Sequence, residues 1–484
     1  MGGQHPKKNV DFLLLKALVV VCNTGIFALC WQLYYTKRLY LTFSGNGNYM
    51  VIGMFLALYT VFASLYGGFQ LTTSRISELA YSHAIALVMT YFFMYIVTWL
   101  LVRSSVPNIG PMILALIGCA GVATLWSLAS YRITNRLIPP RRTLIICDND
   151  EAYKSGMAII KKYNNRFQLI GTVVADIQMV EIKNEIEKYA AEAVMLCGLT
   201  SSMRNDLTKY CIANGVMAYV RPNIGDLLMG SAKMFHMNNL PVYLCQQANP
   251  SISYRIFKRV TDLVISSMGL LVLSPLMLLT AIAIKLYDGG PVLYTQKRMT
   301  KDRKVFLIHK FRSMKTNTGR DGGSIVTLQN DDRITPIGKW IRPCRIDEIP
   351  QLFDILLGNM TLVGPRPERL ETIELYEHEI PEFALRLQVK AGLTGYAQVY
   401  GKANTSPYDK LQMDLMYIGQ QNVWMDLKII LNTFKILFVP ESTEGFETEK
   451  QNAVTITTGV LKSGQNHSKI EAAETEIMNG SFAQ

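Results

Sequence analysis

Two neighbouring acids, Asp347 and Glu348, lie within a short stretch that also carries basic side chains. From Arg342 to Pro367 it reads R-P-C-R-I-D-E-I-P-Q-L-F-D-I-L-L-G-N-M-T-L-V-G-P-R-P. Carboxylates can hold Mg²⁺ or attack as nucleophiles, and an arginine guanidinium can bind two phosphate oxygens at once. Arg366 stands between two prolines whose φ angles are fixed, so its position is restrained. The combination predicts a phosphate-handling site, although two acids could also simply begin a helix and offset its dipole.

Further basic residues lie in segments before and after this stretch. Residues 306–314 read F-L-I-H-K-F-R-S-M and alternate in polarity, as a half-buried strand does. Lys310 and Arg312 would share one face of that strand, where they could meet a phosphate or simply face solvent. Lys402 follows the segment K-A-G-L-T-G-Y-A-Q-V and adds another cation. The sequence N-D-D-R at 330–333 is similar to the acidic metal-binding pair of nucleotide-sugar glycosyltransferases, although acids in loops commonly only form turns.

The chain that must position these residues is long and apolar. Its 484 residues exceed what one hydrophobic core organises and suggest about three domains. It is 49% hydrophobic, and its first part contains apolar segments that each approach the ~20 residues needed to span a bilayer. They cover approximately residues 12–35, 49–66, 84–102 and 111–131. The first is too long for a cleaved signal peptide and others follow it, so we expect a four-helix transmembrane region over 1–140.

The basic residues around these segments predict their orientation, because cytoplasmic loops are enriched in lysine and arginine. One side carries the larger set, Lys7, Lys8, Arg75, Arg132, Arg136, Arg141 and Arg142. The other side carries Lys37, Arg38 and Arg103. We therefore expect the amino terminus and everything after Arg132 to be cytoplasmic. No acidic or basic residue sits deep in a segment, which argues against an ion pathway, and we expect His83 at a segment edge to be interfacial.

Net charge and cysteine usage narrow the class of protein. The net charge of +12 suits anionic lipid or a nucleotide substrate. Nucleic acid is not an expected partner, because no stripe of Lys and Arg interleaved with aromatic residues is present. The eight cysteines form no C-x-x-C pair, so we expect them to be reduced and structural, with no zinc site.

Residues 141–248 alternate strand and helix patterns, which predicts a parallel sheet of Rossmann type. The expected strands cover 143–147, 168–174, 193–197 and 216–220, and the expected helices cover 152–163, 182–190 and 203–214. A dinucleotide site would need a glycine-rich turn after the first strand. Here that turn reads C-D-N-D-E, with no glycine and with acids that would repel a pyrophosphate. This argues against NAD and favours a structural or regulatory domain, which a poorly patterned connector at 223–247 follows.

A second apolar run, residues 263–286, lies near the start of the last folded region, 249–440. Its length alone favours a fifth transmembrane helix with a kink at Ser274-Pro275, because proline removes a helix hydrogen bond. A crossing would leave the paired carboxylates outside the cell, whereas nucleotide-activated donors occur inside. We therefore expect a re-entrant helix over 256–287 that enters the membrane, breaks at Ser274 and Pro275, and returns. The serine hydroxyl or a neighbouring helix could satisfy the freed carbonyl.

Taken together, these motifs resemble those of the bacterial sugar transferase family, the monotopic phosphoglycosyl transferases also called polyprenyl-phosphate sugar phosphotransferases. The resemblance runs from about Tyr254 to Val439. It rests on Lys258-Arg259 with Asp262, the Ser-Pro break, G-P-V-x-x-x-Q-x-R, H-K-F-R-S-M, D-E-I-P-Q-L, L-V-G-P-R-P and G-L-T-G-Y-A-Q-V. The amino-terminal half resembles the long form of the family, with four spans and a nucleotide-fold-like domain before the catalytic unit.

The resemblance implies a two-step phosphotransfer. Asp347 would attack the β-phosphorus of a UDP-sugar, release UMP and carry a phosphosugar, which undecaprenyl phosphate would then attack. Asp347 and Glu348 would share Mg²⁺, which neutralises diphosphate charge. Lys310, Arg342 and Arg366 would hold the phosphates, with Arg312 and Lys402 as further donor-binding candidates. Lys402 stands where many relatives have arginine, and lysine keeps the charge without the bidentate fork.

We therefore expect a membrane protein with a helical transmembrane bundle, a Rossmann-like α/β domain and a cytoplasmic catalytic domain at the inner or plasma membrane of a bacterial cell. Its expected partners are a UDP-sugar, undecaprenyl phosphate and the lipid bilayer, and large relatives suggest a homodimer. The product would begin an exopolysaccharide or capsule. Residues 441–484 are polar, with few aromatics, and are expected to be disordered. Two other functions stay open: a catalytically silent scaffold or regulator of polysaccharide export, and a membrane-bound nucleotide-sugar dehydratase or epimerase.

Overall fold

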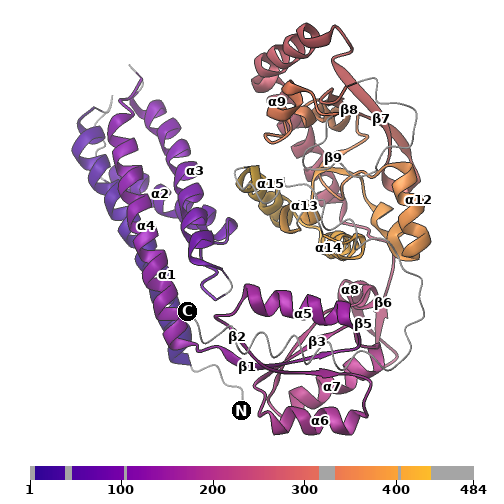
Figure 1. The fold of residues 1–484 in the computed structure, drawn as a ribbon. Helices are drawn as coiled ribbons and strands as arrows, with labels where there is room; N and C mark the ends of the chain where they lie inside the picture. Colours follow the sequence, from indigo (N-terminus) through magenta and orange to yellow (C-terminus); the bar gives the residue numbers. More distant parts are fainter. Residues whose placement is uncertain are drawn as a thin grey trace.

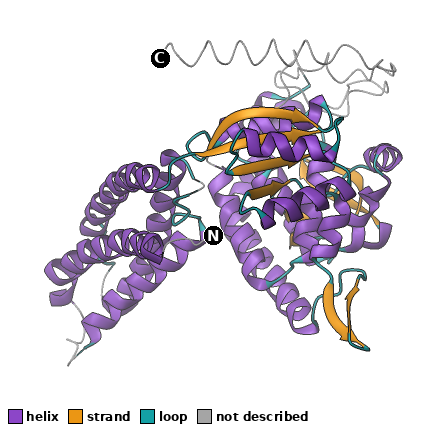
Figure 2. Cartoon of the chain, turned by 90° about the horizontal axis from the view of Figure 1, so that it is seen from below, coloured by secondary structure: helices purple, strands orange, loops and turns teal. Residues whose placement is uncertain are grey.

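The computed structural model describes residues 6–38, 46–72, 74–102, 106–315, 333–401 and 405–437 (Figure 1). Within these residues a helical bundle is followed by a sheet covered by helices and then by a mixed domain. Figure 2 shows the bundle on one side and the strands gathered in the rest of the chain. The tail at 441–484 lies outside the described residues, so its disorder stays a prediction.

The bundle consists of long apolar helices, as predicted. They are α1 (Pro6–Cys30), which continues through a π-helical turn (Trp31–Tyr35) and a 3₁₀ turn (Thr36–Arg38), α2 (Gly47–Leu65), α3 (Ile76–Val102) and α4 (Gly110–Leu137). Each is long and apolar enough to cross a membrane. Aromatic rings fill the interior, where the ring centroids of Phe27 and Phe55 lie 4.3 Å apart. Tyr91 meets Phe55 edge-on at 5.4 Å.

His83 lies inside this bundle, and its predicted place at the membrane interface stays a prediction. Its side chain is fully buried. Nδ1 lies 2.8 Å from the Tyr59 hydroxyl, and Nε2 lies 3.0 Å from the Gly68 carbonyl oxygen. Because α3 begins at Ile76, His83 is about two turns into the helix. The first turns of α3 are polar, so the hydropathy pattern placed the start of the apolar segment at residue 84.

The second region is the parallel sheet that the sequence predicts. Its strands are β1 (Arg141–Cys147), β2 (Phe167–Val174), β3 (Ala193–Cys197) and β4 (Met217–Val220), in the order β2-β1-β3-β4. The helices are α5 (Asp150–Lys162), α6 (Met179–Lys188) and α7 (Ser201–Ala213). Alternate residues of β1 pack against α5 on one face of the sheet and against α6 and α7 on the other. Figure 1 shows these two layers of helices around the sheet.

The segment predicted as a poorly patterned connector, 223–247, is in fact regular. It forms α8 (Ile224–Gly230) and an antiparallel hairpin of β5 (Lys233–Met237) and β6 (Leu240–Leu244). Asn238 and Asn239 provide the left-handed turn of the hairpin, with φ angles of 47° and 65°. Most of the hairpin is exposed on both faces, so it lacks the polar alternation that identifies a half-buried strand.

The last region begins with α9 (Ile252–Asp288), which runs without interruption through Ser274 and Pro275. The Ser274 hydroxyl donates to the Leu271 carbonyl at 2.7 Å. This is the carbonyl that Pro275, four residues later, cannot satisfy because it lacks an N–H. The predicted compensation by serine is confirmed, whereas the predicted break at these two residues is wrong, because the helix continues through them. The re-entrant path of the helix stays a prediction.

The remaining elements form the mixed domain. Its strands make an antiparallel pair of β7 (Leu293–Met299) and β8 (Val305–Phe311) and a parallel pair of β9 (Thr361–Val363) and β10 (Gly392–Thr394). Its helices are α10 (Pro336–Ile341), α11 (Gln351–Leu356), α12 (Leu370–Glu379), α13 (Tyr396–Tyr400), α14 (Pro407–Gly419) and α15 (Val423–Leu437), with 3₁₀ segments at Lys301–Arg303, Ile346–Glu348 and Pro381–Gln388. Buried side chains from both strand pairs and most of these helices form one core.

The mixed domain also contacts the bundle through α15. The Asn432 amide donates to the carbonyl of Leu65 at the end of α2, at 3.1 Å. The Lys435 ammonium lies 2.8 Å from the Ser82 hydroxyl in α3. The end of the bundle that joins α2 to α3 therefore faces the mixed domain.

Candidate active site

The paired carboxylates occupy a turn between two helices. α10 begins at a Thr335 cap, whose hydroxyl accepts the Gly338 N–H at 2.9 Å. After α10, Arg345 adopts a left-handed conformation with φ 52°, which reverses the chain into the 3₁₀ turn that holds Asp347 and Glu348. α11 starts only at Gln351, so the two acids precede this helix and do not belong to its first turn. They lie in the first turn of the 3₁₀ segment that leads into α11, so the helix start that was the alternative interpretation fits this position as well.

Glu348 is clamped between two cations from different elements. Its Oε1 atom lies 2.7 Å from Lys310 Nζ on β8 and 2.9 Å from an Arg366 guanidinium nitrogen. The Glu348 side chain is only 10% exposed. Burial opposes its ionisation, but Arg366 and Lys310 together outweigh that cost and hold the pKa of Glu348 well below its usual value. Glu348 therefore stays charged and holds the side chains of Lys310 and Arg366 in place.

Asp347, its neighbour, is in a different state. Among the described residues nothing donates a hydrogen bond to its carboxylate, and it forms no ion pair within 4 Å. Burial and the adjacent charge of Glu348 raise the pKa of Asp347 from 3.8 to about 6, although Lys310, Arg342 and Arg366 oppose that rise. A carboxylate that has no hydrogen-bond donor within the described part of the chain and lies near several cations is suited to nucleophilic attack on a phosphorus atom.

The turn that carries Arg366 is fixed through its backbone. The Gly364 N–H donates to the Thr394 carbonyl at 2.9 Å, next to the parallel pairing of β9 and β10. A Cβ on Gly364 would lie 2.4 Å from the Lys390 carbonyl oxygen, so this close approach requires glycine. The motifs L-V-G-P-R-P and G-L-T-G-Y-A-Q-V therefore pack directly against each other.

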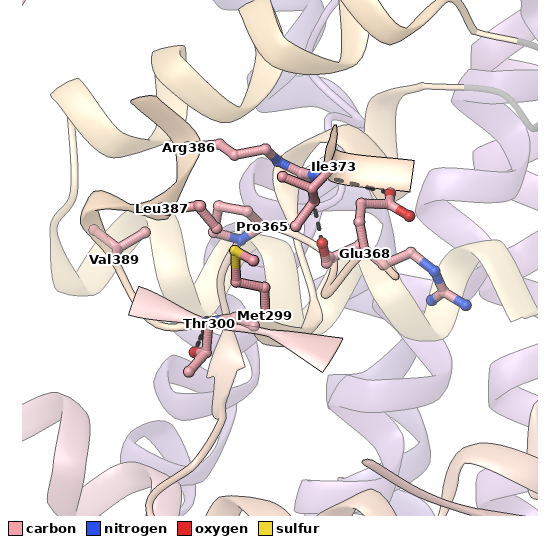
Figure 3. Close-up of a pocket in the computed structure, with 10 residues that line it drawn as sticks. Met299, Thr300, Pro365, Glu368, Ile373, Arg386, Leu387 and Val389 are labelled. Atoms are coloured by element: carbon pink, nitrogen blue, oxygen red, sulfur yellow. Dashed lines mark hydrogen bonds and ion pairs between the residues drawn. The ribbon is translucent and has the colours of Figure 1, made fainter. Parts of the chain in front are cut away.

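Two further arginines hold carbonyl oxygens of the same turn. Arg386 donates to the Arg366 carbonyl at 3.0 Å, and Arg298 donates to the Pro367 carbonyl at 3.1 Å. Figure 3 shows Arg386 and Glu368 at a small pocket behind the turn, where Arg386 lies 3.6 Å from the Glu368 carboxylate. The cavity of about 10 Å³ has room for about one water molecule, so it is not a donor-binding site.

The structure brings together most of the predicted site residues. Lys310, Arg366, Asp347 and Glu348 form one cluster, and the charge of Arg342 also acts on Asp347. Lys402 lies outside the described residues, as does most of the acidic segment 330–333.

Arg312 does not join this cluster. It pairs with Asp288 at the carboxyl end of α9, and its side chain is only 4% exposed. β8 ends at Phe311, so the strand alternation that would align Arg312 with Lys310 stops one residue too early. Arg312 therefore holds the end of α9 and Lys310 contacts Glu348, and donor binding by either residue stays a prediction.

Sequence reasoning assigned no role to three cations near the site. Arg345 is half-buried close to Glu348 and Asp347, and its partial burial lowers its pKa. Arg298 and Arg386 act on the Arg366 turn as described above. Arg298 ends the motif G-P-V-x-x-x-Q-x-R and could have been singled out there, but no local pattern around Arg386 indicates its role.

The carboxylate pair suits a magnesium ion that takes its remaining ligands from a substrate. The described residues contain no group of three or more His, Cys, Asp or Glu side chains able to hold a metal. Mg²⁺ commonly binds one or two protein carboxylates, and phosphate oxygens and water complete its octahedron. No described residue donates to the Asp347 oxygens, whereas Glu348 Oε1 already accepts from two cations. The residues therefore fit Mg²⁺, with Asp347 as the more available ligand.

Comparison with known proteins agrees with this chemistry. The family model described as bacterial sugar transferase matches residues 253–440. An exopolysaccharide production protein of Rhizobium leguminosarum bv. phaseoli is 39% identical over 39% of this chain and 97% of its own length. This chain belongs to the bacterial sugar transferase family. The UDP-glucose:undecaprenyl-phosphate glucose-1-phosphate transferase of Caulobacter vibrioides is 38% identical over 40% of this chain and 74% of that protein.

A longer alignment reaches beyond the family's catalytic unit. The UDP-N-acetylgalactosamine-undecaprenyl-phosphate N-acetylgalactosaminephosphotransferase of Aeromonas hydrophila is 33% identical over 270 residues, which cover 55% of this chain and 58% of that protein. The chain thus spans about half the length of several curated relatives that it matches. Family membership rests on the mixed domain, which contains every element of the carboxylate site.

Proposed function

We propose that this protein transfers a sugar-1-phosphate from a UDP-sugar to undecaprenyl phosphate. The observation that carries the proposal is the contrast between the two carboxylates. Asp347 is unpaired among the described residues, with a raised pKa, while Glu348 is held by two cations. The names of family relatives, which specify UDP-sugars and undecaprenyl phosphate, support the substrate classes.

The transfer has two steps. An Asp347 carboxylate oxygen forms a bond to the β-phosphorus of the donor, and the bond from that phosphorus to the bridging oxygen breaks, so that UMP leaves. A phosphate oxygen of undecaprenyl phosphate then bonds to the same phosphorus, and the aspartyl oxygen leaves as a carboxylate. Lys310 and Arg366 stand beside Asp347 and offset the charge that builds up on the phosphoryl oxygens. Mg²⁺ supplies further neutralisation of the diphosphate when it is bound.

We also propose that α9 enters the membrane and returns on the same side. Near its start, Lys258 pairs with Asp426 of α15. At its end, Asp288 pairs with Arg312, and Ile284 packs with Phe311 of β8. Both ends thus contact one folded domain, and that domain cannot lie on two sides of a bilayer. With the basic loops as a guide to orientation, this side is the cytoplasm.

The product of such a transfer is a lipid-linked sugar, which we propose is the first unit of an exopolysaccharide or capsule. The test is UMP release by the full chain in nanodiscs with undecaprenyl phosphate, Mg²⁺ and a panel of UDP-sugars. We expect release with at least one donor and its loss in Asp347→Asn. An unchanged turnover in Asp347→Asn would remove this residue as the nucleophile. No release across an extended panel would favour a scaffold of polysaccharide export.

A further inference from the structure

The first turns of α9 carry the motif Lys258-Arg259 with Asp262, to which the transfer chemistry assigns no task. The Lys258 ammonium lies 2.9 Å from the Val363 carbonyl oxygen, 3.0 Å from the Tyr417 hydroxyl and 2.7 Å from Asp426 Oδ2. A lysine ammonium has three N–H donors, and here each has an acceptor. Lys258 therefore has no donor left for a substrate phosphate, although it is a cation near a phosphate-handling site.

The Val363 carbonyl is one residue before the turn that carries Arg366. The Tyr417 hydroxyl oxygen lies 3.1 Å from the same carbonyl oxygen and 2.8 Å from Asp426 Oδ1, and its one proton can be donated to either. Tyr417 is 1% exposed and Asp426 is 9% exposed, so this network is buried. Low exposure strengthens such contacts and makes an unpaired member costly.

The other two residues of the motif, Arg259 and Asp262, form hydrogen bonds with the backbone of neighbouring segments. Asp262 accepts the Thr361 hydroxyl at 2.8 Å and the Leu362 N–H at 2.9 Å. Together with Lys258, it holds every residue of β9 from α9. Arg259 donates to the last carbonyls of α11, at 2.8 Å and 2.9 Å. The membrane helix thus holds the segment after the carboxylates and the segment before Arg366.

We propose that Lys258 is a positioning residue that sets the place of Arg366 through the Val363 carbonyl and links the seating of α9 to the active site. This inference rests on the proposed function for its kinetic readout. Lys258 acts through backbone and touches no substrate. Its ion pair with Asp426 of α15 keeps the Lys258 ammonium beside the Val363 carbonyl of β9.

The test is a double-variant cycle with two readouts, donor kcat/KM and thermal stability of the full chain in nanodiscs. Lys258→Met keeps the apolar stem but leaves Asp426 as a buried charge without its cation. The single variant should lose both stability and activity. The double variant, with Asp426→Asn as well, removes both charges and should recover most of the stability. It should still show a donor kcat/KM about 10-fold or more below wild type, because the Val363 carbonyl has lost its ammonium donor.

A matched control is Arg221→Met, which breaks the 2.6 Å ion pair with Asp409 that joins the sheet domain to α14. It should change stability without changing donor kcat/KM. If Lys258 has only a structural role, the double variant recovers stability and kcat/KM together, and the proposal is overturned.

A second measurement separates this proposal from the assigned reaction. Amide exchange of residues 361–367 should be faster in the double variant than in wild type, with α12 as the internal reference, whether or not any donor is turned over. Unchanged exchange would contradict the positioning role even if the transferase activity is confirmed. Faster exchange in a chain that releases no UMP would support the positioning role and refute the reaction instead.

Discussion

Neutralising the two adjacent carboxylates should change stability in opposite directions. Asp347→Asn should stabilise the catalytic domain at pH 7.5, whereas Glu348→Gln should destabilise it. Both substitutions keep the side-chain shape and remove one negative charge. They differ because Asp347 is a half-buried charge without a hydrogen-bond donor among the described residues, while Glu348 is buried and paired with Lys310 and Arg366.

The magnitude for Asp347 follows from its pKa, which rises from 3.8 to about 6 on folding. A folded pKa above the unfolded one means that the protonated form is favoured in the fold. The stability that protonated Asp347 contributes to the fold is fully present below pH 3.8 and is lost as the pH rises through 6. At pH 7.5 the ionised carboxylate therefore costs at most about 3 kcal/mol, which asparagine avoids. We expect about 1–3 kcal/mol after screening, or about 2–8 °C in the thermal midpoint.

Glu348 has the opposite linkage. Its folded pKa is depressed, so its stabilising contribution is present above the unfolded value and is lost as the pH falls through the folded one. Glutamine would leave Lys310 and Arg366 facing each other without a counter-charge, at a cost of roughly 2–4 kcal/mol.

The assay is thermal unfolding of both variants and wild type between pH 4 and 8, followed by fluorescence. The gain from Asp347→Asn should shrink progressively below pH 6 and be a small fraction of its full size at pH 4. A destabilising Asp347→Asn at pH 7.5 would refute the claim that this carboxylate is held as a strained, unpaired charge.

The account makes four further predictions. The acid limb of kcat/KM for UMP release should have an apparent pKa of about 6, because Asp347 must be ionised to attack; a limb near 4 would exclude it as the titrating group. Arg312→Met should reduce stability by roughly 1–3 kcal/mol and leave the donor KM unchanged, since Arg312 pairs with Asp288; a raised KM would restore it as a donor ligand. Gly364→Ala should lose activity, because its Cβ would meet the Lys390 carbonyl at 2.4 Å, and wild-type kinetics in this variant would contradict the rigid turn. EDTA should abolish UMP release and added Mg²⁺ should restore it; release that persists in EDTA would argue against the metal.

Local chemistry accounts for what the sequence could predict. Alternating strand and helix patterns were sufficient to predict the parallel sheet, because its central strands, β1 and β3, are buried by helices from neighbouring segments. Adjacent acids and a proline-flanked arginine were sufficient to predict the cluster of Asp347, Glu348 and Arg366. The compensation at Pro275 was also predictable, since it involves the preceding residue and one carbonyl four residues away.

Contacts between distant segments were not predictable. Arg312 and Lys310 look alike in the sequence, and only the end of β8 and the position of Asp288 separate their roles. Lys258 and Arg386 hold carbonyls that are about 100 and 20 residues away, respectively, so no spacing rule reveals them. The burial of His83 was not predictable because its partners, Tyr59 and Gly68, are on other segments.

The central claim is that Asp347 carries the phosphosugar between the two half-reactions. The most direct measurement is mass spectrometry of the wild-type chain after incubation with the productive UDP-sugar and Mg²⁺ in the absence of undecaprenyl phosphate. The account predicts a sugar-phosphate adduct on the peptide that contains Asp347, formed together with one equivalent of UMP and lost on addition of the lipid phosphate. UMP release that requires the lipid and leaves no adduct, or an adduct on another residue, would contradict it.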